Sequence, residues 1–145
     1  MFTGLVICTG KLINKLSNQI TIQLKDHIVS QVHIGDSVSV SGVCLTCIHK
    51  NTRGLCFEVM PETFRKTNLG LLPYGAEVNI ETSLKVGDPI GGHFVTGHVD
   101  GTAELVSIQQ ESNSKILYFK TTTQITDLMV PKGSVAINGV SLTLI

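Results

Sequence analysis

Residues 37–48, with the sequence SVSVSGVCLTCI, return at 134–145 as SVAINGVSLTLI, and 7 of the 12 positions are identical. Both blocks contain Gly-Val-x-Leu-Thr, in which a glycine turn separates two runs rich in apolar and β-branched residues. This pattern is typical of a β-hairpin. A hairpin that recurs at a distance indicates a chain built from copies of one structural unit. The fold is therefore set by what one copy forms.

A second pair of matching blocks supports the repeat. Residues 2–12, FTGLVICTGKL, align with 95–105, VTGHVDGTAEL, and share five residues. The offset is 93 residues here and 97 for the hairpin blocks, so four residues are inserted between the blocks of the second copy. The first copy continues well beyond its hairpin block, whereas the second stops at Ile145. We expect a complete repeat over 1–88 and the first part of a second over 89–145, with truncation as the simplest interpretation.

Each complete copy is expected to be a small β-barrel. Val, Ile and Thr make 44 of the 145 residues and Ala only 3, which favours strands over helices. One short helix is predicted from Pro61 to Gly70, because proline suits the first turn of a helix and glycine its end. Six short antiparallel strands hide their edges by closing on themselves. The prediction is an all-β fold: a closed six-stranded antiparallel Greek-key barrel followed by an incomplete second copy. The clearest predicted strands lie at 19–24, 37–40, 44–48, 55–60 and 76–81.

Composition and charge exclude several classes of protein. Lys and Arg number 11, as do Asp and Glu, so the chain lacks the clustered positive charge that binds nucleic acid or anionic lipid. Hydrophobic residues make 42% of the chain, too many for disorder, yet no run approaches the roughly 18 apolar residues of a membrane span. The N-terminus has no basic segment of the kind that opens a signal peptide. We expect a globular cytoplasmic protein with reduced thiols that binds neither nucleic acid nor membrane.

Four cysteines include one CxxC spacing, at Cys44 and Cys47. A metal or disulfide function is not favoured, because a zinc ribbon needs a second ligand pair and a thioredoxin-type site lies at a helix start. A strand places side chains three residues apart on opposite faces. We expect Cys47 and Cys56 to be buried and Cys44 to face the other way.

Two features carry candidate chemistry. Residues 91–101, GGHFVTGHVDG, place four glycines around His93 and His98, and glycine permits close approach to a ligand or a strand. The alternative is a linker whose histidines are satisfied by backbone. In addition, the repeat aligns Cys44 and Thr46 with Ser141 and Thr143, and residues i and i+2 share one face of a strand. Two equivalent sites for similar ligands, with different chemistry at each, are one interpretation; a tight hairpin with a core strand is the other.

Five motifs, in order along the chain, resemble the riboflavin synthase family of the alpha-chain type: MFTG at 1–4, SGVCLT at 41–46, PETFRKTNLG at 61–70, GGHFVTGHVDG at 91–101 and KGSVAINGVSLT at 132–143. The resemblance implies two homologous barrels and a homotrimer, with each site between the first barrel of one subunit and the second of a neighbour. It also implies a dismutation of two 6,7-dimethyl-8-ribityllumazine molecules, the last step of riboflavin biosynthesis. The products are riboflavin and 5-amino-6-ribitylamino-pyrimidinedione, and no cofactor is needed.

The resemblance also implies the site residues. In the first repeat the substrate contacts would be Gly4, Leu5, Val6, Cys44, Leu45, Thr46, Glu58, Val59, Met60, Pro61, Glu62 and Thr63. In the second repeat they would be Gly97, His98, Val99, Lys132, Ser141, Leu142 and Thr143. Cys44 would assist nucleophile addition at the acceptor lumazine, and Ser141 with His98 would transfer the proton from the donor's 7-methyl group.

This chain departs from the family pattern in two ways. Ser41 stands where the family usually has Asn before the hairpin turn. The sequence also stops before the rest of the second barrel, where the resemblance implies further ligand contacts, a carboxylate near the site and the trimerising helix. We therefore expect this chain by itself to be inactive or to turn over far more slowly than one with a complete second barrel. A non-catalytic lumazine- or flavin-binding protein is the alternative function, and the pairing of Cys44 with Ser141 favours the enzyme. A barrel that binds single-stranded nucleic acid would need a basic groove with stacking aromatics. The neutral net charge and the seven aromatic residues, none of them Trp, do not favour that function.

Overall fold

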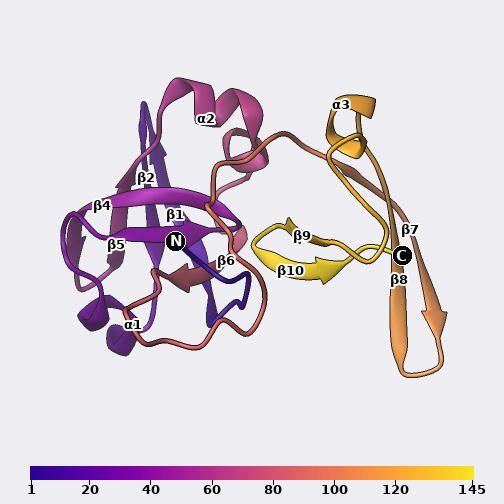
Figure 1. Cartoon of the computed structure of the whole chain (residues 1–145). Coiled ribbons are helices and arrows are strands. Elements are labelled where there is room, and N and C mark those ends of the chain that lie inside the picture. Colours follow the sequence, from indigo (N-terminus) through magenta and orange to yellow (C-terminus); the bar gives the residue numbers. More distant parts are fainter.

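The first repeat forms a closed six-stranded antiparallel barrel in the computed structural model, which describes residues 1–145. The neighbours around the barrel run β1-β2-β5-β4-β3-β6, so hairpin pairs are joined by crossovers, as predicted (Figure 1). The strands are β1 (Cys8–Leu16), β2 (Gln19–Gln23), β3 (Ser37–Val40), β4 (Val43–Asn51), β5 (Gly54–Glu58) and β6 (Glu77–Thr82). Three short helical segments join them: α1 (Asp26–Gln31), α2 (Pro61–Lys66) and the 3-10 turn η1 (Asn68–Leu71).

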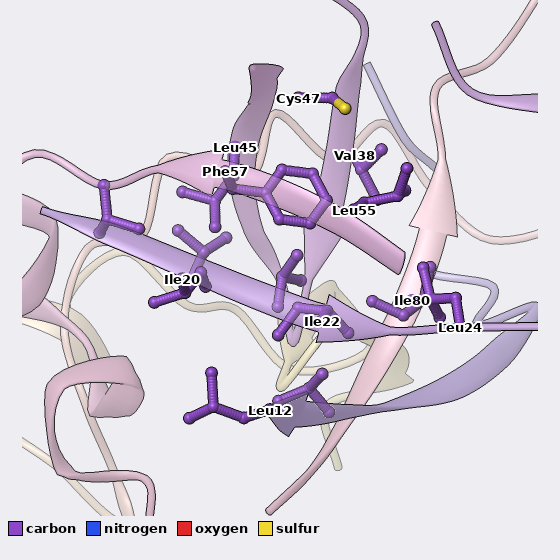
Figure 2. Packing of buried hydrophobic residues seen from close by; sticks show 14 of the residues in the cluster. Leu12, Ile20, Ile22, Leu24, Val38, Leu45, Cys47, Leu55, Phe57 and Ile80 are labelled. Atoms are coloured by element: carbon purple, nitrogen blue, oxygen red, sulfur yellow. The ribbon is translucent and has the colours of Figure 1, made fainter. Parts of the chain in front are cut away.

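Alternate residues of each strand fill the barrel (Figure 2). On β2, Ile20 and Ile22 are buried while their neighbours are not, because successive side chains of a strand point to opposite faces. On β4, Val43, Leu45 and Cys47 point inward in the same way. Full burial of one such side chain contributes about 1.5–3 kcal/mol. A cluster of 17 buried residues therefore holds one closed barrel.

Two elements of the first repeat were not predicted. The alternation of apolar and polar residues that marks a strand is interrupted in β1, because its register with β2 shifts between Leu12 and Asn14, as at a β-bulge. Helix α1 holds one buried residue, Ile28, and is supported from outside by Lys50, whose Nζ donates to the carbonyl oxygen of Val32 at 2.7 Å. A bulge and a long-range cap both depend on the folded chain, so neither leaves a local sequence signal.

The cysteine prediction is right for two residues and wrong for one. Cys47 is fully buried, and Cys44 lies on the opposite face of β4 and is half-buried. Cys56 is only half-buried, because Leu55 and Phe57 take the inward positions on β5. All four cysteines are free thiols.

The second repeat consists of two separate hairpins, as expected of an incomplete copy. They are formed by β7 (Glu104–Glu111) with β8 (Ser114–Lys120), and by β9 (Ser134–Ile137) with β10 (Val140–Thr143). A single short helical turn, α3 (Thr123–Thr126), joins them. In Figure 1 the β9–β10 hairpin lies next to the barrel, and the β7–β8 hairpin lies farther out. Within residues 1–145, β10 is the last strand, and the second repeat has no counterparts of β5 and β6 there.

No helix in the structure is both long enough and apolar enough to cross a membrane.

Candidate functional site

Equivalent residues of the two repeats meet each other. Phe2 and Val95, which align at an offset of 93, form an antiparallel bridge with N–H to oxygen distances of 2.8 and 3.0 Å. The hairpin turns also touch: a Cβ on Gly42 would lie 2.7 Å from the nitrogen of Gly139, its counterpart at an offset of 97. Contacts between equivalent positions define an approximate two-fold axis that relates the two repeats.

Around this axis each repeat covers the Gly-Val-x-Leu-Thr hairpin of the other. The backbone N–H of Ser141 donates to the carbonyl oxygen of Gly4 at 2.8 Å, and the N–H of Cys44 donates to that of Gly97 at 2.9 Å. Val99, which follows Gly97, packs against the core of the first barrel. Within this chain, therefore, Gly4 contacts Ser141 and Gly97 contacts Cys44, each across the two repeats. Each candidate site is composite, with a hairpin from one repeat and a glycine loop from the other.

Both loops require glycine at the point of contact. Gly4 has φ of +78° and Gly97 has φ of +79°, a left-handed conformation that L side chains rarely adopt. A Cβ on Gly4 would lie 2.8 Å from the Cβ of Ser141, and one on Gly97 would lie 2.7 Å from that of Cys44. In both repeats, the left-handed backbone conformation and the close contact with the hairpin therefore require glycine at this position.

The site on the Cys44 hairpin lies on the outer face of the barrel. Cys44 and Thr46 point away from the core, and Thr46 is paired in register with Glu58 on β5. The carboxylate of Glu58 accepts a hydrogen bond from the side-chain amide of Asn18 at 3.0 Å. Gly97 joins this group through its bond to Cys44. The predicted residues of this hairpin and of β5 are therefore close together.

Several predicted contact residues differ in what they can offer a ligand. Leu45 and Val59 are core residues, with 4% and 0% of their surface exposed, so only their backbone could meet a ligand. Met60 is exposed at the start of α2. Pro61 and Glu62 are exposed, and Thr63 is half-buried, in the first turn of the same helix.

The site on the Ser141 hairpin is more open. Gly4 is buried, Val6 and Leu142 are half-buried, and Leu5 and Thr143 are exposed. Lys132 is also exposed and has φ of +66°, an uncommon conformation for a residue with a side chain. Its N–H donates to the carbonyl oxygen of Leu144 at 2.9 Å. In the first repeat the same position is Gly35, whose N–H donates to Cys47.

The imidazole that reaches Ser141 is His93, which sequence analysis singled out without giving it a role. Nδ1 of His93 lies 2.7 Å from Oγ of Ser141. The residue chosen as partner of Ser141, His98, is exposed, and its backbone N–H donates to Oγ1 of Thr96 at 3.3 Å. The Gly91-Gly92 pair before His93 was the signal that could have identified it.

Glu81 is a second residue that sequence analysis missed. Its carboxylate is 5% exposed and accepts hydrogen bonds from the N–H of Thr3 (2.6 Å), the hydroxyl of Thr3 (2.8 Å) and the N–H of Gly4 (3.0 Å). A buried carboxylate is costly unless it is paired or hydrogen-bonded, so these donors fix the loop and Glu81 together. Glu81 is the fifth of the six residues of β6, EVNIET, which begins with a second glutamate, Glu77, so the sequence alone does not single it out.

The thiols divide by environment. Burial raises the pKa of Cys47, and burial likewise raises that of Cys8, so both are poor nucleophiles at neutral pH. Cys44 lies instead on the outer face beside Gly97. No group of three His, Cys, Asp or Glu side chains in the structure could hold a metal ion.

Comparison with known proteins agrees with the two-repeat architecture. Residues 3–83 and 96–145 match the model of the lumazine binding domain, so the chain belongs to the family of proteins built from that domain. More particularly, it belongs to the riboflavin synthase family. It is 40% identical over 147 residues to riboflavin synthase from Bacillus subtilis (strain 168), covering 99% of this chain and 68% of that protein. It is also 40% identical over 149 residues to riboflavin synthase from Escherichia coli (strain K12), covering 99% of this chain and 70% of that protein.

Solved structures show the same fold. LumP complexed with riboflavin superposes with a TM-score of 0.88, and LumP complexed with 6,7-dimethyl-8-(1'-D-ribityl) lumazine with a TM-score of 0.85. In both cases the sequence identity is 24%, and the match covers 99% of this chain and 79% of the other.

Proposed function

We propose that this protein is a riboflavin synthase, a transferase that converts two 6,7-dimethyl-8-ribityllumazine molecules into riboflavin and 5-amino-6-ribitylamino-pyrimidinedione. The proposal rests on the family and on one structural observation. Two equivalent hairpins present Cys44 and Ser141, and each hairpin is covered by the glycine loop of the opposite repeat. Two similar composite sites suit a reaction between two identical molecules.

The reaction depends mainly on the relative orientation of the two substrate molecules. The ring system of a lumazine delocalises the carbanion formed at its 7-methyl group, so the protein must hold two flat heterocycles face to face. Proximity and orientation can supply about 7–11 kcal/mol of a reaction barrier. Proton transfer by positioned side chains contributes a further factor of roughly 10² to 10⁴. No cofactor is needed for these steps.

We assign the roles as follows. Cys44 assists nucleophile addition at the acceptor molecule, and Ser141 accepts the proton of the donor, with His98 as a second candidate for proton transfer. The lumazine contacts are the predicted residues of both repeats, within domains bounded at 1–88 and 89–145. Assembly as a homotrimer, which the resemblance implies, and a cytoplasmic location, which the N-terminal sequence favours, belong to the same proposal.

A turnover assay tests the function. The protein is incubated with 6,7-dimethyl-8-ribityllumazine and the flavin absorbance is followed over time. Cys44→Ala should reduce the rate by at least tenfold, whereas Cys56→Ala should leave it within twofold. Cys56 is the matched control because it is also half-buried on the outer face but lies on β5, paired with Thr21 of β2. Equal losses in the two variants, at equal folded fraction, would contradict the role of Cys44.

A non-catalytic lumazine- or flavin-binding protein is the second candidate. The observation that favours it is the difference between the repeats, since only the first is a closed barrel. Saturable quenching of riboflavin fluorescence without any flavin formation from lumazine would select this alternative. We expect binding in either case, because the Cys44 hairpin, β5 and the start of α2 all belong to the first repeat and carry most of its predicted contacts.

A further inference from the structure

We propose that Asn79 is a positioning residue that holds the two repeats together at their hairpin turns and so sets the geometry of both composite sites. Asn79 lies on β6 of the first barrel and is half-buried. Its side-chain Nδ2 donates to the carbonyl oxygen of Asn138, in the turn of the β9–β10 hairpin, at 2.9 Å. The inference rests on the proposed function only in treating the Cys44 and Ser141 hairpins as ligand sites.

The backbone of Asn79 holds the corresponding turn of its own repeat. The N–H of Ser41 donates to the carbonyl oxygen of Asn79 at 2.7 Å, and the N–H of Asn79 donates to Oγ of Ser41 at 3.1 Å. Ser41 is 8% exposed, so these bonds are shielded from water. Ser41 and Asn138 are equivalent positions of the two repeats, at an offset of 97 residues. One asparagine thus bonds to equivalent residues of both repeats.

The two turns have the same backbone conformation. Ser41 and Gly42 have φ of +49° and +87°, and Asn138 and Gly139 have φ of +52° and +82°. Two consecutive residues with positive φ are the pattern of a type I′ turn, which fixes the register of the strands on either side. Figure 1 shows the tip of the β9–β10 hairpin pointing toward the barrel, where the two turn glycines pack against each other. Asn79 therefore ties together two defined turns at the point where they touch.

The bond from Asn79 is unlike the other contacts between the repeats. Of the side-chain hydrogen bonds in the structure, only this one joins residues 1–88 to residues 89–145. The other hydrogen bonds between the repeats run from backbone to backbone, and no salt bridge joins the repeats. Backbone bonds are available to any residue except proline, whereas this bond requires the side-chain amide. A substitution of Asn79 therefore weakens the contact between the repeats while every backbone bond can still form.

Both composite sites depend on this contact. Cys44 and Ser141 each lie two residues after the turn glycine of their hairpin, and each donates its backbone N–H to the glycine loop of the other repeat. A shift of one turn relative to the other moves each hairpin against the loop that covers it. A misplacement of about 1 Å can slow a reaction roughly 100-fold. Asn79 therefore acts on both sites without touching a ligand.

Amide hydrogen exchange tests the contact without a ligand. Asn79→Ala removes the donor, and the amides of Cys44 and Ser141 should then exchange roughly fivefold faster, the factor that corresponds to about 1 kcal/mol for one hydrogen bond. The amide of Val59, which donates to the carbonyl oxygen of Asn18 at 2.7 Å within the first barrel, should keep its rate. A substitution that merely weakened the barrel would speed the exchange of all three amides alike.

Asn51→Ala is the matched control. The Oδ1 of Asn51 accepts one hydrogen bond, from the backbone N–H of Arg53 at 2.7 Å, and both residues belong to the first repeat. In this variant the exchange of the Cys44 and Ser141 amides should change by less than about twofold, because the bond lost does not join the repeats. Asn79→Asp keeps the size of the side chain and replaces the donor by an acceptor, so it should reproduce the effect of Asn79→Ala. It decides the outcome if the alanine variant does not fold.

Ligand binding tests the consequence for the two sites. Riboflavin is titrated into the protein, and NMR follows the amide signals of Cys44 and Ser141 separately. Asn79→Ala should weaken the binding at both hairpins by a similar factor, roughly fivefold or more. Thr143→Ala should weaken only the binding that is followed at Ser141, because Thr143 belongs to the predicted contacts of that hairpin alone.

The proposal is overturned by unchanged exchange at the Cys44 or the Ser141 amide, by an equal increase at Val59, or by an equal effect of Asn51→Ala. Riboflavin binding that weakens at one hairpin only would also overturn it. Failure of the proposed function has a different signature. A protein that binds no riboflavin and forms no flavin, but in which Asn79→Ala speeds exchange at the two hairpin amides alone, loses the synthase assignment and keeps Asn79 as the residue that positions the hairpins.

Discussion

The two repeats share a sequence pattern but differ in what they bury. Leu12 on β1 is 2% exposed, whereas Leu105, its counterpart on β7, is 47% exposed. The first four strands are present in both repeats, and the difference comes from β5 and β6, which close only the first barrel. A strand pattern therefore specifies a hairpin locally, but the core forms only when the last two strands complete the ring.

Truncation of this equivalent leucine pair should have the largest effect. Leu12→Ala is expected to lower the free energy of unfolding by about 2–5 kcal/mol, because it opens a cavity in a closed core. Leu105→Ala should change it by less than about 0.5 kcal/mol, as is usual for a surface position. Urea unfolding of both variants checks the comparison. Similar losses would mean that the second repeat buries its leucine in solution.

The fold could be predicted from the sequence because its main signals are local or repeated along the chain. Alternation along 19–24 and the repeat of the hairpin block are local or near-local signals, and they predicted the barrel and the outward direction of Cys44 and Thr46. The inward-facing Phe57, which turns Cys56 outward, shows that one residue of error in strand phase reverses a burial prediction.

The site was predicted less completely because its contacts cross between repeats. The backbone N–H of Ser141 donates to Gly4 and that of Cys44 donates to Gly97. Neither hairpin segment contains a sequence signal that identifies its partner loop. His93 and His98 are both surrounded by glycines, and only the folded backbone separates the one that reaches Ser141. Glu81 lies far along the chain from the loop that it fixes.

Glu81 offers the second comparison between the repeats. It anchors the loop at Thr3 and Gly4, whereas the chain contains no strand equivalent to β6 to anchor Thr96 and Gly97. Glu81→Gln should cost about 1.5–3 kcal/mol, because hydrogen bonds to a charged group are lost and a buried amide replaces it. Glu77→Gln, at an exposed position of the same strand, should cost much less.

The outcome of this pair is measured in two ways. Thermal unfolding gives the stability of each variant. Exchange of the 7-methyl protons of 6,7-dimethyl-8-ribityllumazine for deuterium, followed by proton NMR in deuterium oxide, reports on the Ser141 site that the loop covers. We expect Glu81→Gln to impair both. Unchanged exchange in a destabilised Glu81→Gln protein would show that the anchor serves the barrel alone.

A smaller effect should separate Lys132 from Gly35. The two positions are equivalent, with φ of +66° and +94°, and only the first carries a side chain. Lys132→Gly relieves a left-handed conformation that costs roughly 1–2 kcal/mol, and part of this gain is offset by the greater freedom of glycine in the unfolded chain. We expect a net change of stability below about 1 kcal/mol together with weaker lumazine binding.

The control exchanges the two residues. Gly35→Lys should destabilise the first barrel slightly and leave lumazine binding unchanged, since Gly35 lies outside the predicted contacts. Fluorescence titration with 6,7-dimethyl-8-ribityllumazine measures the binding, and urea unfolding measures the stability. If Lys132→Gly binds as tightly as the unmodified protein, the lysine owes its strained position to something other than the ligand.

The smallest effect concerns helix α2, which only the first repeat contains. A hydrogen bond from Arg65, with the charges of Arg65 and Lys66, lowers the pKa of Glu62. A carboxyl whose folded pKa lies below its unfolded value stabilises the protein above the unfolded pKa, and that contribution is lost as the pH falls through the folded pKa. Because the pair is exposed and screened by water, the contribution is small. Glu62→Gln should therefore lower the urea midpoint slightly at pH 7 and not at all in strong acid, while Glu111→Gln, in the exposed β7–β8 hairpin, should show neither the loss nor its pH dependence. An equal difference between Glu62→Gln and the unmodified protein at both pH values would assign the effect to helix propensity or packing instead of charge.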